Sequence, residues 1–226
     1  MGSAGSFSRL NRKTMILVDV ISLELSWKPK NLLVVGCGSG IEAATLACGL
    51  GCSVIGIDLQ TNFDPEAKKF ATLKAGDATK LEFSNGLFDV VYSYHALEHI
   101  HDDQKAVSEM KRVLKPNGLL CIGTPNRSRL IGYIGSEGTS FGEKLRWNLA
   151  DWKARIRGRF RNEYGAHAGY TKSELQTILS KPFTDVRSIT EYYYLKLYPS
   201  HRTLIKFLVK SGVSRFIFPS IYFLCR

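Results

Sequence analysis

The sequence predicts an α/β fold organised around a doubly wound, mostly parallel sheet. The first indication is a run of four aliphatic residues, 32–35, followed by glycines at positions 36, 38 and 40. Fully buried parallel strands appear as continuous apolar runs rather than alternating ones. The second indication is the alternation of strand-like and helix-like segments from residue 32 to residue 123, as right-handed crossovers require. We expect residues 1–226 to form a single domain.

The three glycines indicate a tight turn between a strand and a helix. Glycine adopts backbone angles and close approaches that a Cβ atom would forbid. Residues 41–47 then have helical character, so the order is strand, glycine turn and helix. This arrangement binds nucleotide-like ligands at the carboxyl end of a parallel sheet. A dinucleotide fingerprint would need a third glycine at position 41, which is Ile41, so a dinucleotide is not favoured.

Further strand patterns follow in the order that such a sheet needs. Residues 53–57 form a second apolar strand ending at Asp58, eighteen residues after Gly40. A carboxylate at that place can accept hydrogen bonds from both hydroxyls of a ribose. Residues 87–93 predict another strand, with a helix opening over 94–100.

The next helix and strand complete this half of the chain. We expect a helix from about Met110 that Pro116 and Gly118 stop, and a strand over residues 119–123. Before the first strand, residues 10–27 predict a helix that covers the edge of the sheet.

These patterns, in this order, resemble class I S-adenosylmethionine-dependent methyltransferases over about residues 30–126. The spacing G-x-G-x-G resembles their first motif, and Leu-Glu-His-Ile at 97–100 is similar to the type 11 and ubiquinone-biosynthesis O-methyltransferase branch. The resemblance implies a seven-stranded sheet with an antiparallel last strand, S-adenosylmethionine as cofactor and S-adenosylhomocysteine as product. It further implies a small hydroxylated or lipid-like acceptor, with O-methylation favoured.

The resemblance also implies which residues hold the cofactor. The glycine turn would hold the methionine moiety, Asp58 the ribose and Asp77 the adenine, while Ser93 would border the cofactor at the end of the fourth strand. The full predicted set is Gly36, Cys37, Gly38, Gly40, Asp58, Leu59, Asp77, Ala78, Ser93 and Tyr94.

Two histidines after the fourth strand are candidates for acid–base chemistry. His95, Glu98 and His99 match H-x-x-E-H, an inverted zinc-protease signature, but no third ligand is evident from spacing, so no metal is predicted. A histidine can take a hydroxyl proton as the methyl group arrives in an in-line displacement. We expect His95 or His99 to be this base, and a purely structural role for both is the alternative.

A second histidine segment lies further along the chain. His167 and Tyr170 resemble the His-x-x-Tyr/Phe-Thr segment that follows the lid in these enzymes. The resemblance makes both residues candidates for the acceptor pocket. The alternative for His167 is a loop histidine satisfied by backbone groups.

Residues 127–165 predict an insertion that acts as a lid. The chain has a net charge of +11, of which residues 127–161 carry nine Lys/Arg against three Asp/Glu and residues 199–226 carry five Lys/Arg without an acid. Within 141–161, apolar side chains at helical intervals (Leu145, Leu149, Trp152, Ile156, Phe160) alternate with basic ones, which predicts a basic amphipathic helix. Its apolar face would cover the active site, lie on an anionic membrane or accompany a nucleic-acid backbone.

The remaining segments complete the predicted sheet. Thr171 to Glu174 form a capping box for a helix over 175–179. A sixth strand is expected at about 185–194, a short helix at 204–209 and the last strand at 221–225.

The cysteines and the remaining motifs bear on compartment and on competing functions. Five cysteines without a C-x-x-C pair favour free thiols in a reducing cytoplasm, with peripheral membrane contact as a further option. An RNA methyltransferase is disfavoured because Ser-Tyr-His-Ala at 93–96 is not the Asn/Asp-Pro-Pro-aromatic motif of base-amine enzymes. A cofactor-binding protein without catalysis stays open, as does the oligomeric state.

Overall fold

The structure is a computed structural model that describes residues 7–133, 138–164 and 167–226. In the first half the elements are α1 (Arg12–Glu24), β1 (Asn31–Val35), α2 (Ile41–Leu50), β2 (Ser53–Asp58), η1 (Ala67–Lys69), β3 (Thr72–Ala75), β4 (Phe88–Tyr94), η2 (Leu97–His99), α3 (Asp103–Val113) and β5 (Leu114–Pro125). In the second half they are α4 (Phe141–Ile156), η3 (Asn162–Tyr164), α5 (Lys172–Leu179), β6 (Val186–Ser188), α6 (Thr190–Leu197), η4 (Pro199–His201), α7 (Arg202–Lys210), α8 (Ser214–Ile217) and β7 (Ser220–Cys225).

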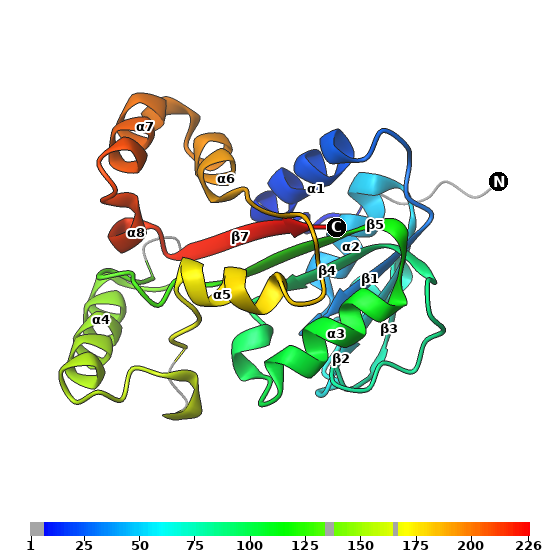
Figure 1. The fold of residues 1–226 in the computed structure, drawn as a ribbon, viewed down its shortest axis with the longest axis horizontal. Helices are drawn as coiled ribbons and strands as arrows, with labels where there is room; N and C mark the ends of the chain where they lie inside the picture. Colours follow the sequence, from blue (N-terminus) through cyan, green and yellow to red (C-terminus); the bar gives the residue numbers. More distant parts are fainter. Residues whose placement is uncertain (1–6, 134–137, 165–166) are drawn as a thin grey trace.

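All strands form a single sheet in the order β3-β2-β1-β4-β5-β7-β6 (Figure 1). The pairs from β3 through β5 are parallel, and β7 is antiparallel to both β5 and β6. The predicted seven-stranded sheet with an antiparallel last strand is therefore confirmed. Its strand order reverses between β1 and β4, which is where ligands bind in open α/β sheets.

Helices cover both faces of the sheet, so the predicted doubly wound arrangement is also confirmed. One apolar core joins α1, α2 and α6 to the sheet, and Leu32, Val90 and Tyr222 lie within it. The other core lies between the sheet and the helices α3 and α5, with Leu33, Val91 and Phe223 inside. Neighbouring residues of a strand thus enter opposite cores, as the pleat requires.

The segment after β4 differs from the predicted helix over 94–100. His95 adopts a left-handed backbone conformation, with φ of 51°, and only the short 3-10 turn η2 follows. The α-helix begins at Asp103, where the Asp102 side chain accepts a hydrogen bond from the Lys105 amide. His95 and His99 therefore do not share one face of a helix. The helix α3 also ends before Pro116, which lies within β5.

The predicted sixth strand over 185–194 is wrong for most of its length. Only Val186–Ser188 pairs with β7, and Thr190–Leu197 forms the helix α6. The helical backbone places Tyr193 against Tyr222 of β7, with ring centroids 4.0 Å apart. Tertiary packing of tyrosines thus overrides their preference for strands.

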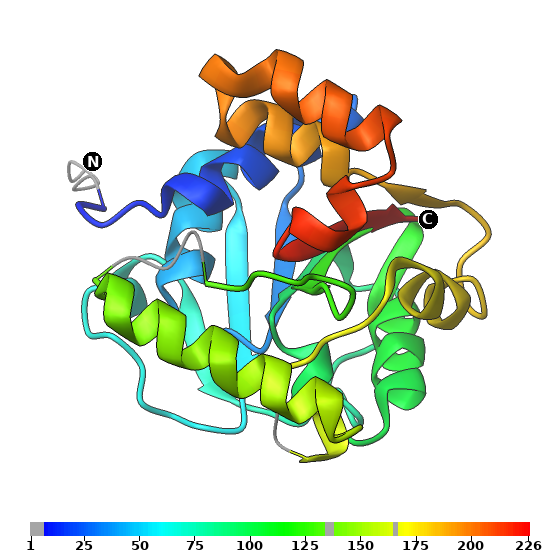
Figure 2. The same ribbon diagram turned by 90° about the vertical axis from the view of Figure 1, so that its left-hand side faces the viewer.

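The predicted lid contains α4, which begins at a capping box formed by Ser140 and Glu143. The helix ends at Ile156 rather than near residue 161, and Phe160 lies beyond it, buried beneath the Arg155 guanidinium at 3.8 Å. Figure 2 views the molecule from the end where the parallel strands finish. At this end α4 lies on one side of the sheet and the α6–α7 pair lies on the other. Positions 134–137 and 165 of the predicted insertion lie outside the described residues.

Over the described ranges of the chain, no helix combines the length and apolar character that crossing a bilayer requires.

Candidate functional site

The glycine turn after β1 leaves an opening at the carboxyl end of the strand. A Cβ atom at Gly36 would lie 2.2 Å from the Cβ of Ala96, so this position requires glycine. Gly38, with φ of 52°, has no protein atom within 4 Å of the place of a Cβ. Its amide donates a hydrogen bond of 2.8 Å to Asp58 Oδ2, which fixes the turn against the end of β2.

A cleft of about 790 Å³ begins at this turn. It brings together six of the predicted cofactor residues, namely Gly36, Gly38, Asp58, Leu59, Asp77 and Ala78. His101, which the sequence did not single out, also lines this cleft. We call this the cofactor cleft.

The other four predicted cofactor residues do not line this cleft. Cys37 is buried, and its burial raises the pKa of its thiol to about 12. Gly40 lies at the start of α2 and packs against Leu73. Ser93 is buried in β4, and its hydroxyl has no hydrogen-bond partner among the described residues. Tyr94 lines a second cleft instead.

The two aspartates of the cofactor cleft are held by local hydrogen bonds. Asp58 Oδ1 accepts a 3.0 Å bond from the Gln60 amide, in addition to the bond from the glycine turn. Asp77 Oδ1 accepts bonds of 2.8 Å from the amide and from the hydroxyl of Thr79. These bonds hold the pKa of Asp77 below its ordinary value. Both carboxylates are thus oriented before a ligand binds.

The second cleft, of about 390 Å³, has mostly aromatic walls and is called the acceptor cleft below. Tyrosines come from β4, from α6 and the residue that follows it, and from β7, namely Tyr94, Tyr193, Tyr194, Tyr198 and Tyr222. Lys13 and Arg129 add positive charge to its wall. The sequence points to His167 for an acceptor pocket but gives no sign of the tyrosine walls, because the tyrosine run at 192–194 has the pattern of a strand.

His95 is a lining residue of both clefts. Its Nε2 lies 3.0 Å from Ser220 Oγ, and its ring lies 4.1 Å from that of Tyr94. The surrounding protein, and then the charge of Arg129, lower the pKa of His95 below its ordinary value. The imidazole is therefore neutral near pH 7.

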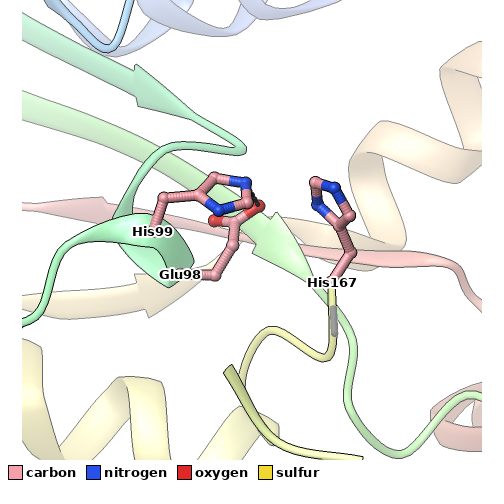
Figure 3. A group of neighbouring side chains, drawn as sticks. All are labelled: Glu98, His99 and His167. Atoms are coloured by element: carbon pink, nitrogen blue, oxygen red, sulfur yellow. Dashed lines mark ion pairs between the residues drawn. The ribbon is translucent and has the colours of Figure 1, made fainter. Parts of the chain in front are cut away.

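His99 and His167 come together although they are far apart in the sequence. Their ring centroids are 4.7 Å apart, and the ligand atoms of Glu98, His99 and His167 all lie within 4.8 Å of one another (Figure 3). His99 lines the cofactor cleft and His167 lines the acceptor cleft. The spacing of residues in the sequence gave no sign of this third member.

Tyr170 does not line the acceptor cleft. It is buried, and its hydroxyl donates a 2.9 Å bond to Asp103 Oδ2 and lies 3.3 Å from the Leu97 carbonyl. Tyr170 thus attaches the segment after the lid to η2 and α3.

Arg129 connects the lid to the acceptor cleft and was missed from the sequence. It is buried, donates to the carbonyls of His167 and Ala168, and forms an ion pair of 3.4 Å with Asp151 of α4. A basic residue inside a basic segment gave no indication that it would be buried.

Known proteins match the part of the chain that contains the cofactor cleft. Residues 33–122 match the family described as a methyltransferase domain. The chain is 30% identical to norajmaline N-methyltransferase of Rauvolfia serpentina, over 54% of this chain and 44% of that protein. It is 36% identical to ubiquinone biosynthesis O-methyltransferase of Thiobacillus denitrificans, over 48% of this chain and 51% of that protein. The chain thus spans about half the length of these curated relatives.

A solved structure extends the likeness to the fold of nearly the whole chain. Phosphoethanolamine N-methyltransferase 2 of Haemonchus contortus, in complex with S-adenosyl-L-methionine, superposes with a TM-score of 0.54 at 20% identity. The superposition covers 99% of this chain and 60% of that one. The sheet order, the glycine turn and the matched domain agree, and together they support a class I S-adenosylmethionine-dependent methyltransferase.

Proposed function

We propose that this protein transfers a methyl group from S-adenosylmethionine to the hydroxyl group of a small acceptor held in the acceptor cleft. The observation that carries the proposal is the position of His95, which lines both the cofactor cleft and the acceptor cleft. A base at that junction can contact an acceptor while the acceptor faces the methyl group. Residues 1–226 act as one domain in this proposal, with 127–165 as a lid.

The reaction is a single in-line displacement. A lone pair of the acceptor oxygen forms the new O–C bond while the C–S bond breaks, and its electron pair stays on the sulfur of S-adenosylhomocysteine. The hydroxyl proton passes to neutral His95, whose ring is oriented by Ser220. His99 is a weaker candidate for this base because it lines the cofactor cleft and not the acceptor cleft.

The walls of the acceptor cleft favour an oxygen acceptor over an amine. Lys13 and Arg129 place positive charge in the wall, which opposes a cationic amine and favours a hydroxyl that develops negative charge. The tyrosine rings favour a flat or unsaturated molecule by stacking. The similar proteins include N- and O-methyltransferases, so their names do not decide between these acceptors.

The experiment compares phenols and alcohols with amines of the same carbon skeleton, measuring S-adenosylhomocysteine formation. We expect turnover of hydroxyl compounds, and His95→Gln should lower kcat by about 10²- to 10⁴-fold. The affinity for S-adenosylhomocysteine should change little, because Gly38 and Asp58 remain. His201→Gln, at an exposed histidine of η4, is the matched control.

Three results would contradict the proposal. Faster turnover of the amines would make the protein an N-methyltransferase, and undiminished turnover by His95→Gln would remove the base. Cofactor binding without turnover of any acceptor in cell extract would indicate a protein that only binds the cofactor.

We further propose that α4 contacts an anionic membrane. Phe141 and Ile156, near the two ends of α4, are 82% and 88% exposed. The helix also carries Lys144, Arg146, Lys153 and Arg155. Exposed apolar groups beside basic ones are typical of helices that lie in a membrane interface.

Vesicles of anionic phospholipid at low salt test this contact. Phe141→Ser together with Ile156→Ser should weaken binding severalfold, whereas Leu23→Ser on α1, a residue 72% exposed, should not. Absence of vesicle binding by the unmodified protein would refute the membrane contact. Binding to RNA with a steep salt dependence would favour a nucleic-acid partner instead.

A further inference from the structure

We propose that Glu98, His99 and His167 bind a divalent transition-metal ion of the zinc class between the cofactor cleft and the acceptor cleft. Glu98 and His99 belong to η2, and His167 comes from the segment after the lid (Figure 3). The potential ligand atoms of the three side chains lie within 4.8 Å of one another.

The carboxylate of Glu98 is the strongest indication of a missing partner. Its side chain has no exposed surface, and neither of its oxygens has a hydrogen-bond partner among the described residues. The nearest basic atom is His99 Nε2, at 3.9 Å from Oε1. Buried carboxylates are normally paired, hydrogen-bonded or bound to a metal.

A protonated Glu98 is the competing explanation for this burial. An uncharged carboxyl group tolerates burial better than a carboxylate, yet its O–H would still need an acceptor. No acceptor for it is found among the described residues. A metal ion satisfies the carboxylate and both imidazoles at once.

The ligand types indicate which ions fit. Two imidazole nitrogens and one carboxylate oxygen are typical of zinc and of neighbouring transition metals, whereas magnesium and calcium prefer oxygen ligands only. Bonds of about 2.0–2.1 Å around a tetrahedral ion place ligand atoms about 3.3 Å apart. His99 and His167 are exposed, so rotation of their side chains can close the cluster to that spacing.

Three protein ligands leave a coordination position open. His167 lines the acceptor cleft and His99 lines the cofactor cleft, so the ion would lie where the two clefts meet. On the basis of the proposed function, an acceptor hydroxyl is the ligand for this position. Coordination would lower the pKa of that hydroxyl and ease the loss of its proton to His95.

Titration of the metal-free protein with Zn²⁺ alone tests the site without any acceptor. We expect one equivalent to bind by calorimetry, and Co²⁺ to give the visible absorption of a tetrahedral site. Glu98→Gln and His167→Ala should each weaken zinc binding by about 100-fold or more, because each removes a direct ligand. His201→Ala serves as the matched control, and circular dichroism verifies the fold of each variant.

Glu98→Gln keeps the shape of the side chain and removes its charge, so it should fold at least as well as the unmodified protein. Zinc should raise the melting temperature of the unmodified protein and of His201→Ala, but not that of Glu98→Gln. Lack of zinc binding by the unmodified protein, or equal affinity in Glu98→Gln and His167→Ala, would refute the site. If the unmodified protein binds zinc but transfers no methyl group to any acceptor, the proposed function is refuted and the metal site is not.

Discussion

The cofactor cleft and the acceptor cleft differ in the part of the chain that builds them. The cofactor cleft is formed by the ends of neighbouring parallel strands and by turns, with Gly36, Gly38 and Asp58 in one stretch of 23 residues. The acceptor cleft is formed by side chains from α1, β4, α6 and β7 and from the loops around Arg129 and His167. Backbone geometry determines the first cleft, and packing between distant elements determines the second.

This difference predicts how each cleft responds to substitution. A backbone turn either has the conformation that a ligand needs or lacks it, so small changes there should have large effects. A wall of several tyrosines shares its contacts among them, so single changes should have graded effects. Of the four predictions below, three test this contrast and one tests the stability of the cofactor region, from the largest expected effect to the smallest.

Gly38→Ala should weaken cofactor binding more than the other substitutions. The new methyl group meets no protein atom within 4 Å, but it would point into the open space beside the turn and would strain a backbone with φ of 52°. We expect the dissociation constant for S-adenosylhomocysteine to rise by more than about 100-fold, which corresponds to about 3 kcal/mol. Calorimetry measures the change.

Gly212→Ala provides the matched control for Gly38→Ala. Gly212 also has positive φ, of 74°, and also has nothing within 4 Å of a Cβ, but it follows α7 rather than lining a cleft. Both variants should lose about 1 kcal/mol of stability from the left-handed backbone. Only Gly38→Ala should lose cofactor binding, and an equal loss in both would mean that strain alone is responsible.

Asp58→Asn should weaken binding of S-adenosylhomocysteine by about 10- to 100-fold, since hydrogen bonds to a charged group are worth about 1.5–3 kcal/mol. The amide oxygen can still accept the bond from the Gly38 amide, so the glycine turn should persist, while the Gln60 amide loses its acceptor. Adenine alone should bind both proteins equally, because it does not reach the ribose site that we predict at Asp58. Equal weakening for adenine and for the full nucleoside would show that the turn itself has moved.

Most of the cofactor cleft was predictable from the sequence because its residues lie near one another along the chain. An apolar run, three glycines and an aspartate at the next strand end specify one geometry. Two predicted cofactor residues are exceptions. Ser93 and Cys37 lie at the right positions in the chain, yet their side chains turn into the interior, and spacing does not reveal the direction of a side chain.

Apart from His167, the walls of the acceptor cleft were not predictable, because they depend on contacts between residues far apart in the sequence. The tyrosine run at 192–194 matched a strand, and only its packing against β7 makes it a helix. His167 meets His99 through a fold that brings positions 68 residues apart together. Arg129 looked like one of many surface charges, whereas its bonds to backbone carbonyls hold it inside.

Glu42 makes the stability of the cofactor region depend on pH. It lies in the first turn of α2, and burial raises its pKa from 4.5 to about 7, despite bonds from Tyr92 and Thr14. In the unfolded chain the carboxyl group ionises near 4.5, so between about pH 4.5 and 7 the folded state holds more protons. The free energy of unfolding should therefore fall as pH rises through this window.

Glu42→Gln should remove this dependence, because the amide does not ionise. At each pH, the free energy of unfolding of the variant is compared with that of the unmodified protein. This difference should favour the variant by about 1–3 kcal/mol more at pH 8 than at pH 5. Urea unfolding at both pH values measures the difference. The same pH dependence in Glu42→Gln would assign the effect to other carboxyl groups, such as Glu98.

Tyr222→Phe should have the smallest effect, and it tests the graded behaviour expected of the acceptor cleft. The Tyr222 hydroxyl lies 3.4 Å from the Tyr94 hydroxyl, a long hydrogen bond, while its ring remains stacked on Tyr193. Removing the hydroxyl keeps the stacking, so kcat/KM for the acceptor should fall by only about threefold to tenfold, or about 1 kcal/mol. Cofactor affinity should be unchanged. A loss as large as that of Gly38→Ala would mean that a single tyrosine determines the acceptor cleft, and the contrast between the two clefts would fail.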